Sequence, residues 1–206
     1  YEGKYIERDI NKAFHYFNLS LKHQHAPTQV AFGEIYYEGK YVRRDVDKAI
    51  YYLLLASKQN DQVAQLRLGL IYYTSPYIPH DINKAIHYFS LAAEQQNPKA
   101  QFCLGHIYCE GKDLQRNVEA GINYYLLSAN QNFADAQKNL GIIYYEGKIV
   151  PRDIKKAINY LSLAANQSHE EALYLLGKIY FDGVFVPQNI NKAIHFFSLA
   201  ANQNIP

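Results

Sequence analysis

The sequence predicts an all-α protein, an α/α solenoid of paired antiparallel helices that repeat every 36 residues. One observation is a glycine with this spacing, followed two positions later by Ile-Tyr: Gly33, Gly69, Gly105, Gly141 and Gly177. A second is a small residue with the same period: Ala13, Ala49, Ala85, Gly121, Ala157 and Ala193. The third is helical periodicity in the segments between them. Such repeats bury their apolar faces by stacking on their neighbours, so we expect no closed catalytic core.

The first helix of each repeat, helix A, is expected to begin after an Asp or Asn and to run for about 14 residues. The capping column is Asp9, Asp45, Asp81, Asn117, Asp153 and Asn189. A lysine stands three residues on in most copies, which favours a simple cap over a capping box. After Asp153, the polar residues 155, 159, 162 and 166 share one narrow face.

The second helix, helix B, is expected to be shorter, about 11 residues, as in 136–146. Pro27 and Pro98 stand near its first turn, where proline is tolerated. Its central glycine costs ~0.5–1 kcal/mol against alanine, so we expect another helix to approach closely there. We expect the Tyr of Ile-Tyr to pack beside the gap. A second glycine ends helix B in a left-handed cap: Gly3, Gly39, Gly111, Gly147 and Gly183.

The connector to the next repeat carries one aliphatic residue that we expect to be buried: Val42, Ile78, Leu114, Val150 or Val186. Two copies depart from the pattern. Ser75 replaces the capping glycine, and a non-glycine there costs ~1–2 kcal/mol, so this turn is expected to take another path. Gly121 lies inside a helix A where other copies have alanine, so we expect the helix geometry to differ locally there.

The whole chain, 1–206, is expected to form one array and to be a fragment of a longer one. The predicted repeats are 9–44, 45–80, 81–116, 117–152 and 153–188, with a partial repeat at 189–206.

Composition excludes several classes. The net charge is +2 from 21 basic and 19 acidic residues, so the basic face that nucleic-acid binding needs is missing. Cys103 and Cys109 are too few for a disulfide framework and are expected to be small core residues in a reducing compartment. No apolar run is long enough to cross a bilayer and no signal peptide is evident, so we expect a cytoplasmic protein without membrane insertion.

Strung together, the columns read L-G-x-I-Y-Y-E-G-K-x-V-x-R-D-x-x-K-A-I-x-Y-x-x-L-A-A, most fully over 140–165. This strongly resembles the Sel-1-like repeat family, a relative of tetratricopeptide repeats. The resemblance implies a right-handed superhelix in which helix A lines the concave side. It also implies a role as an adaptor or scaffold in protein complexes. Such arrays also occur joined to protein kinase domains.

No catalytic motif or phosphate-binding glycine loop appears, so we expect no enzyme and no cofactor. His15, His87 and His195 share a column but lie in repeats that are not adjacent, so they are not expected to bind a metal. The carboxylates Glu38, Glu110, Glu146 and Asp182 fall one to a repeat, too dispersed for acid–base catalysis, and are interpreted as solvated helix ends.

The polar face of helix A is the candidate partner-binding surface, because concave solenoid faces usually bind and Asn both donates and accepts hydrogen bonds. Its candidate residues are Asn11, His15, Asp47, Tyr51, Asn83, His87, Glu119, Asn123, Lys155, Asn159, Asn191 and His195. The predicted partner is a protein or peptide, not a nucleic acid or a small-molecule substrate.

The sequence thus favours a non-enzymatic scaffold that binds a peptide or helix in its groove. The alternative is a regulatory arm of a larger signalling enzyme, such as a protein kinase, whose catalytic domain lies outside this chain. RNA binding is a third hypothesis, against which the near-neutral face argues.

Overall fold

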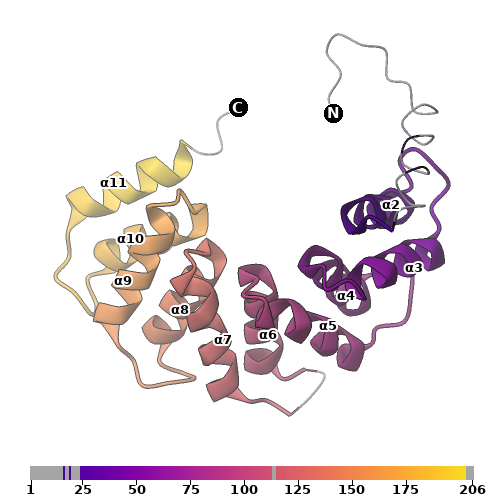
Figure 1. Cartoon of the computed structure of the whole chain (residues 1–206). Helices are drawn as coiled ribbons and strands as arrows, with labels where there is room; N and C mark the ends of the chain where they lie inside the picture. Colours follow the sequence, from indigo (N-terminus) through magenta and orange to yellow (C-terminus); the bar gives the residue numbers. More distant parts are fainter. Residues whose placement is uncertain (1–15, 17–18, 20–23, 113–114, 203–206) are drawn as a thin grey trace, which may run out of the picture. The chain divides into compact units, whose positions relative to one another are not determined.

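The computed structural model describes residues 16, 19, 24–112 and 115–202 (Figure 1). Within these residues the secondary structure is helical and contains no strand. The helices are α2 (Ala26–Glu38), α3 (Val46–Ser57), α4 (Gln62–Thr74), α5 (Ile82–Glu94), α6 (Pro98–Glu110), α7 (Val118–Asn130), α8 (Ala134–Glu146), α9 (Ile154–Ala165), α10 (Glu170–Asp182) and α11 (Ile190–Ala201). The predicted α/α solenoid is therefore confirmed in its helix content and order. Asp9, Asn11, Ala13, His15, Gly3 and Leu114 lie outside the described residues.

The chain separates into two compact units, Tyr1–Gln95 (unit 1) and Gln96–Pro206 (unit 2). Unit 1 holds α2 to α5 and unit 2 holds α6 to α11. Within each unit, neighbouring helices along the chain run in opposite directions, joined by short connectors (Figure 1). Each even-numbered helix packs most extensively on the odd-numbered helix that follows it, so α8 pairs with α9 more closely than α9 does with α10.

Helix A corresponds to the odd-numbered helices and helix B to the even-numbered ones. The expected repeat that begins at Asp153 would join α9 to α10, whereas the closest pair is α8 with α9. The even-numbered helices have 13 residues each, so the expectation that helix B is shorter than helix A was wrong. Their first turn begins directly after the short loop, two residues before the start proposed from the sequence for α8.

The capping column behaves as the sequence predicts. The side chain of Asp45, Asp81, Asn117, Asp153 or Asn189 accepts a hydrogen bond from the backbone amide three residues on, at 2.9–3.1 Å. At the other end of the even-numbered helices, Gly39, Gly111, Gly147 and Gly183 have φ between 62° and 67°. Ser75 instead has φ −66° and ψ 130°, so this turn takes an extended path, as expected.

A residue after the cap completes the helix end in every described copy. Arg44 Nε donates to the carbonyl of Tyr37 at 2.9 Å, and Arg152 Nε donates to the carbonyl of Tyr145 at 2.9 Å. His80, Arg116 and Gln188 bind the equivalent carbonyls of Tyr73, Cys109 and Phe181 at 2.7–2.8 Å. Polar side chains that reach back in this way satisfy carbonyls that the helix leaves without a partner.

The recurring glycine lies where the paired helices touch. A Cβ atom at Gly141 would lie 2.6 Å from Leu161 Cγ, and one at Gly69 would lie 2.5 Å from the ring of Phe89. The equivalent neighbours of Gly33, Gly105 and Gly177 are Leu53, Tyr125 and Phe197. Close helix approach is confirmed, but the side chain that meets the glycine is not the Tyr of Ile-Tyr, which we expected to pack beside the gap. The filling side chain comes from the following helix, 20 residues on.

The Tyr of Ile-Tyr stacks elsewhere. Its ring lies parallel to an aromatic ring on the following helix, with centroids 5.8–5.9 Å apart and interplanar angles of 7–10°. The pairs are Tyr36–Tyr52, Tyr72–Tyr88, Tyr108–Tyr124, Tyr144–Tyr160 and Tyr180–Phe196. In four of these five copies a lysine three residues after the cap lies over the first ring, with Nζ 4.8–5.2 Å from the centroid: Lys48, Lys84, Lys156 and Lys192. In α7 the residue at this position is Ala120. This cation–π contact explains why lysine recurs there.

A close contact with α6 explains why glycine rather than alanine stands at position 121 in α7. A Cβ atom there would meet the Sγ atom of Cys109 and lie 2.9 Å from its backbone nitrogen. Both cysteines are buried and free, as predicted. Burial raises the pKa of the Cys103 thiol to about 11, so this thiol is poorly reactive at neutral pH.

A column of buried glutamines joins the paired helices from α2/α3 to α8/α9, a feature that the sequence reasoning missed. Gln29, Gln65, Gln101 and Gln137 are 1–4% exposed. Each accepts a hydrogen bond at 2.7–2.8 Å from the amide of a glutamine 30 residues on: Gln59, Gln95, Gln131 or Gln167. Gln137 Nε2 also donates to the carbonyl of Ala129 at 3.2 Å and to Asn132 Oδ1 at 3.1 Å.

The loop before each even-numbered helix holds a non-glycine residue with positive φ: Gln24, Asn60, Gln96, Asn132 or Ser168, at 53–66°.

We expect Ser168→Gly to stabilise unit 2 by ~0.5–1 kcal/mol. Glycine removes the strain of the left-handed conformation, and this gain exceeds the extra chain entropy that glycine gives the unfolded state. Urea unfolding followed by circular dichroism measures this. Asn132→Gly is the contrasting control and should destabilise, since Asn132 Oδ1 accepts from Gln137 and Gln167. A loss of stability in Ser168→Gly would contradict the strain argument.

Candidate functional site

The predicted binding residues that the structure describes lie on the odd-numbered helices, and all have exposed side chains. Tyr51 is 57% exposed and packs edge-on against Tyr52, with ring centroids 5.3 Å apart. His87 and His195 similarly lie against the neighbouring rings of Tyr88 and Phe196, at 5.0 and 5.5 Å. None of the pockets described below is lined by a residue of the predicted set. The odd-helix face therefore stays a prediction.

The even-numbered helices, by contrast, form pockets at equivalent positions. One lies between α2 and α4 in unit 1, and two lie in unit 2, between α6 and α8 and between α8 and α10. In all three, the earlier helix contributes the residues one, four and five positions after its central glycine. The later helix contributes the residue two before its glycine and those one and two after it. The same register thus produces the pocket each time.

The α2/α4 pocket has a volume of about 210 Å³. It is lined by Gly33, Glu34, Tyr37, Glu38, Leu53, Arg67, Leu70, Ile71 and Thr74. Arg67 Nη2 and Glu34 Oε1 form an ion pair at 2.7 Å, which links α2 to α4.

The α8/α10 pocket has a volume of about 300 Å³. It is lined by Ile142, Tyr145, Glu146, Leu161, Glu171, Leu175, Lys178 and Ile179. Two of its carboxylates are paired: Glu171 with Lys138 at 3.1 Å, and Glu146 with Lys148 at 3.2 Å. Its floor matches that of the α2/α4 pocket, because Tyr145, Leu161 and Ile179 are the equivalents of Tyr37, Leu53 and Ile71.

The α6/α8 pocket is larger, about 520 Å³, and more polar. It is lined by His106, Cys109, Glu110, Lys112, Arg116, Tyr125, Asn139, Ile142, Ile143 and Ile149. Asn139 Nδ2 donates to the hydroxyl of Tyr125 at 3.1 Å, and burial holds the pKa of that phenol above its usual value. A hydrogen bond from Lys112 lowers the pKa of Glu110.

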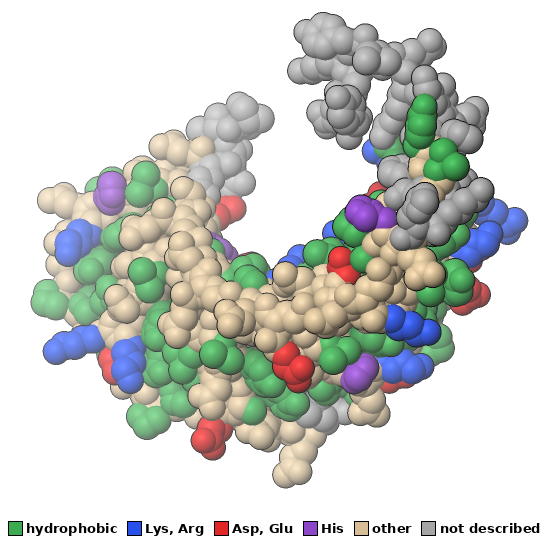
Figure 2. All heavy atoms as spheres, viewed as in Figure 1, with side chains coloured by type: hydrophobic (Ala, Val, Ile, Leu, Met, Phe, Trp, Pro, Cys, Tyr) green, Lys and Arg blue, Asp and Glu red, His purple; other side chains and the backbone are tan. Residues whose placement is uncertain are grey.

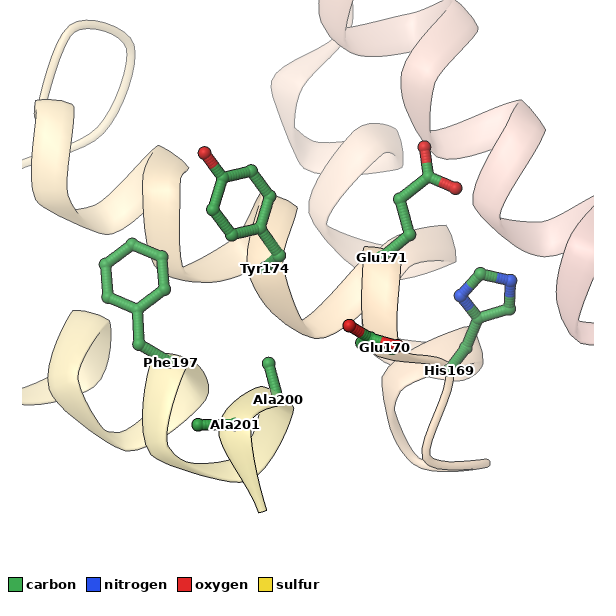
Figure 3. Close-up of a pocket in the computed structure, with 7 residues that line it drawn as sticks. All are labelled: His169, Glu170, Glu171, Tyr174, Phe197, Ala200 and Ala201. Atoms are coloured by element: carbon green, nitrogen blue, oxygen red, sulfur yellow. The ribbon is translucent and has the colours of Figure 1, made fainter. Parts of the chain in front are cut away.

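A fourth pocket, of about 610 Å³, lies between α10 and α11 (Figure 3). Its lining includes Tyr174, Phe197, Ala200 and Ala201. The ring centroids of Tyr174 and Phe197 are 5.8 Å apart. The equivalent surface of the preceding repeat, which includes Leu161, is covered by Ala172 and Leu176 of α10. This pocket therefore includes the face of α11 that is equivalent to the face of α9 covered by α10. It differs from the three pockets above, which lie between two even-numbered helices.

Glu38, Glu110 and Glu146, which the sequence presents as solvated helix ends, line the three repeated pockets. Their spacing of one per repeat was the available signal, but only the packing shows that they border cavities. Within the part of the chain that the structure describes, no cluster of three or more His, Cys, Asp or Glu could hold a metal ion. On the face drawn in Figure 2, basic and acidic side chains are scattered rather than gathered in one patch.

Repeated pockets along stacked helix pairs define the class of this protein as a helical-repeat array. Comparison with known proteins makes the assignment more particular. The Sel1 repeat model matches six consecutive segments: 1–25, 28–61, 62–97, 98–133, 134–169 and 170–205. The chain belongs to the Sel1 repeat family, whose members are generally protein-interaction scaffolds without catalytic activity. The comparison with curated proteins gives no match.

Solved structures agree on the fold. A protective antigen of uropathogenic Escherichia coli strains that displays an SLR fold has a TM-score of 0.90 and 24% identity over 99% of this chain. This chain spans 44% of the length of that antigen. A Sel1 repeat protein from Oxalobacter formigenes has a TM-score of 0.86 and 26% identity, covering 98% of this chain and 83% of its own. Helicobacter pylori cysteine rich protein B has a TM-score of 0.52 and 28% identity over 67% of this chain.

The matched segments begin at the even-numbered helices, so the segment 134–169 holds α8 followed by α9. In this division, the first helix of a repeat is even-numbered. In the described residues, no helix combines the length and the apolar character needed to cross a membrane. The kinase-linked alternative stays a prediction, since all six matched segments are Sel1 repeats.

Proposed function

We propose that this chain is a non-enzymatic scaffold that binds a segment of a partner protein along the even-numbered helices of its units. The observation that carries the proposal is the recurrence of one pocket at equivalent positions in α2/α4, α6/α8 and α8/α10. A surface that repeats with the helices suits a partner whose side chains also recur at intervals. Ligand sites are typically concave, apolar at the base and polar at the edge, as these are.

The predicted odd-helix face is a competing surface for the same partner. Its exposed Asn123 and Asn159 offer hydrogen bonds, but the described pockets lie elsewhere. Residues that line a cavity exclude water better than exposed polar groups outside a cavity, and water exclusion strengthens binding. This favours the even-numbered helices.

Paired variants separate the two surfaces. Peptides that bind the wild-type chain are selected from a random display library, and their affinities are measured by fluorescence anisotropy. We expect Leu70→Trp combined with Ile142→Trp to weaken binding by at least about tenfold, because an indole ring then fills space in all three repeated pockets: Leu70 lines the α2/α4 pocket, and Ile142 lines both pockets of unit 2. The control, Asn123→Trp combined with Asn159→Trp, adds the same ring on the odd-numbered helices and should leave binding unchanged. The reverse pattern would assign binding to the odd-helix face and refute the proposal.

A further inference from the structure

We propose that the α2/α4 pocket selects a partner segment in which an aliphatic side chain stands next to a Lys or Arg. This inference rests on the proposed function and names the chemistry of the partner at one pocket. Two observations carry it: the apolar floor of the pocket and an unpaired carboxylate at its edge.

The floor of the α2/α4 pocket is apolar and rigid. Leu53 is 1% exposed and Ile71 is 5% exposed, so both are held by the core. Leu70 and the ring of Tyr37 complete the apolar lining. An apolar cavity of ~150 Å³ holds a benzene molecule. The roughly 210 Å³ here therefore suits one aliphatic side chain rather than a whole folded element.

Of the two carboxylates that line this pocket, Glu34 is in an ion pair and Glu38, within the described part of the chain, is not. Glu34 is engaged by Arg67 at 2.7 Å. Glu38 has no ion-pair partner among the described residues, whereas its equivalents Glu110 and Glu146 pair with lysines two residues on, at 2.7 and 3.2 Å. The corresponding Lys40 lies over the ring of Tyr41 instead, with Nζ 5.6 Å from the centroid.

The nearby guanidinium of Arg44 is also engaged elsewhere. Its Nη2 donates to the backbone carbonyl of Glu38 at 3.0 Å, and its Cζ lies 4.3 Å from the centroid of the Tyr77 ring. The carboxylate of Glu38 is thus available to a cation on the partner. A charge at the edge of an interface contributes selectivity more than affinity, so we expect it to choose among aliphatic anchors by their neighbours.

The α8/α10 pocket is a matched contrast within the chain. It shares the same floor, but Lys178 replaces Leu70, and Glu146 is paired with Lys148. A basic residue on the partner would therefore meet a lysine there. We expect this pocket to show no preference for basic neighbours.

The test is a display library in which one central leucine is fixed and its neighbours are randomised. Selection uses the Ile142→Trp chain, because Ile142 lines both the α6/α8 and the α8/α10 pockets; filling them lets the α2/α4 pocket be read by itself. We expect Lys and Arg beside the leucine to be enriched about threefold over Asp and Glu, as suits one exposed ion pair. Glu38→Lys should invert this preference. Glu94→Lys, which makes the same charge change at the exposed end of α5, should preserve it. Circular dichroism checks that each variant is folded.

The outcomes separate the two proposals. Peptide binding that shows no charge preference beside the leucine, and that Leu70→Trp abolishes, would overturn the inference and leave the proposed function standing. Peptide binding that survives Leu70→Trp, or no peptide binding at all, would overturn the proposed function and the inference with it. A preference for basic neighbours that Glu38→Lys leaves intact would assign the selection to another carboxylate and overturn the role of Glu38.

Discussion

Gly141→Leu is expected to destabilise unit 2 by ~1–3 kcal/mol, because an added side chain overpacks a filled contact. A Cβ atom alone would lie 2.6 Å from Leu161 Cγ and 3.2 Å from the Leu161 backbone nitrogen. Leu161 is 1% exposed and is enclosed by the cluster that includes Ala164 and Leu176. It therefore has no room to move aside. Thermal and urea unfolding followed by circular dichroism measure the change.

A double-mutant cycle isolates this contact. Gly141→Ala fills the gap with one methyl group, and Leu161→Ala removes the opposing side chain at a cost of about 2–5 kcal/mol. If the two side chains compete for one space, the double variant loses less stability than the sum of the single variants, by more than about 0.5 kcal/mol. Strict additivity, or a Gly141→Leu chain with an unchanged melting temperature, would refute the close-packing explanation for the recurring glycine.

Gln137→Leu is expected to cost about 2 kcal/mol, because it removes a buried amide on which several partners converge. Gln137 is 1% exposed, accepts from Gln167 at 2.7 Å, and donates to Ala129 and Asn132. These bonds join the end of α7, the start of α8 and the loop after α9. An apolar residue of similar size leaves the polar groups of this joint without their partner. Urea unfolding gives the free energy, and an unchanged midpoint would mean that the glutamine column contributes no stability.

The chain supplies a reference for this experiment. In α10 the equivalent position is Leu173, 2% exposed, and the residue that corresponds to Asn132 is Ser168. The double variant Gln137→Leu, Asn132→Ser copies that arrangement into α8. We expect it to recover part of the stability that Gln137→Leu loses, because the shorter serine leaves one fewer amide unsatisfied. A double variant less stable than Gln137→Leu would show that position 132 depends on asparagine for its backbone conformation instead.

Much of the fold follows from residues that act locally. Asp45 and Asp153 cap helices because their side chains reach the first-turn amides, and Gly147 ends one because it adopts positive φ without a Cβ clash. The absence of glycine at Ser75 correctly indicated a different turn. Such signals need only a few neighbouring residues, so one sequence suffices to find them.

The candidate site was harder to predict, because it depends on which helices pair. A tandem repeat can be divided into units at any starting residue. The period is the same for every division, so it does not show which two helices pack as a pair. The division that starts at Asp153 directed attention to the exposed polar residues of α9, such as Asn159. Packing instead joins α8 to α9 and leaves the pockets between successive even-numbered helices, at positions such as Ile142 and Leu175.

The sequence by itself determined the helices, their ends, their period and the family, because capping, helix periodicity and glycine conformation operate over distances of a few residues. Only the tertiary structure decided that Leu161 rather than Tyr144 fills the space at Gly141, and that Glu38 borders a cavity rather than a bare helix end. The reason is physical: those contacts join residues 20 or more positions apart, and side-chain volume decides them after the helices have met.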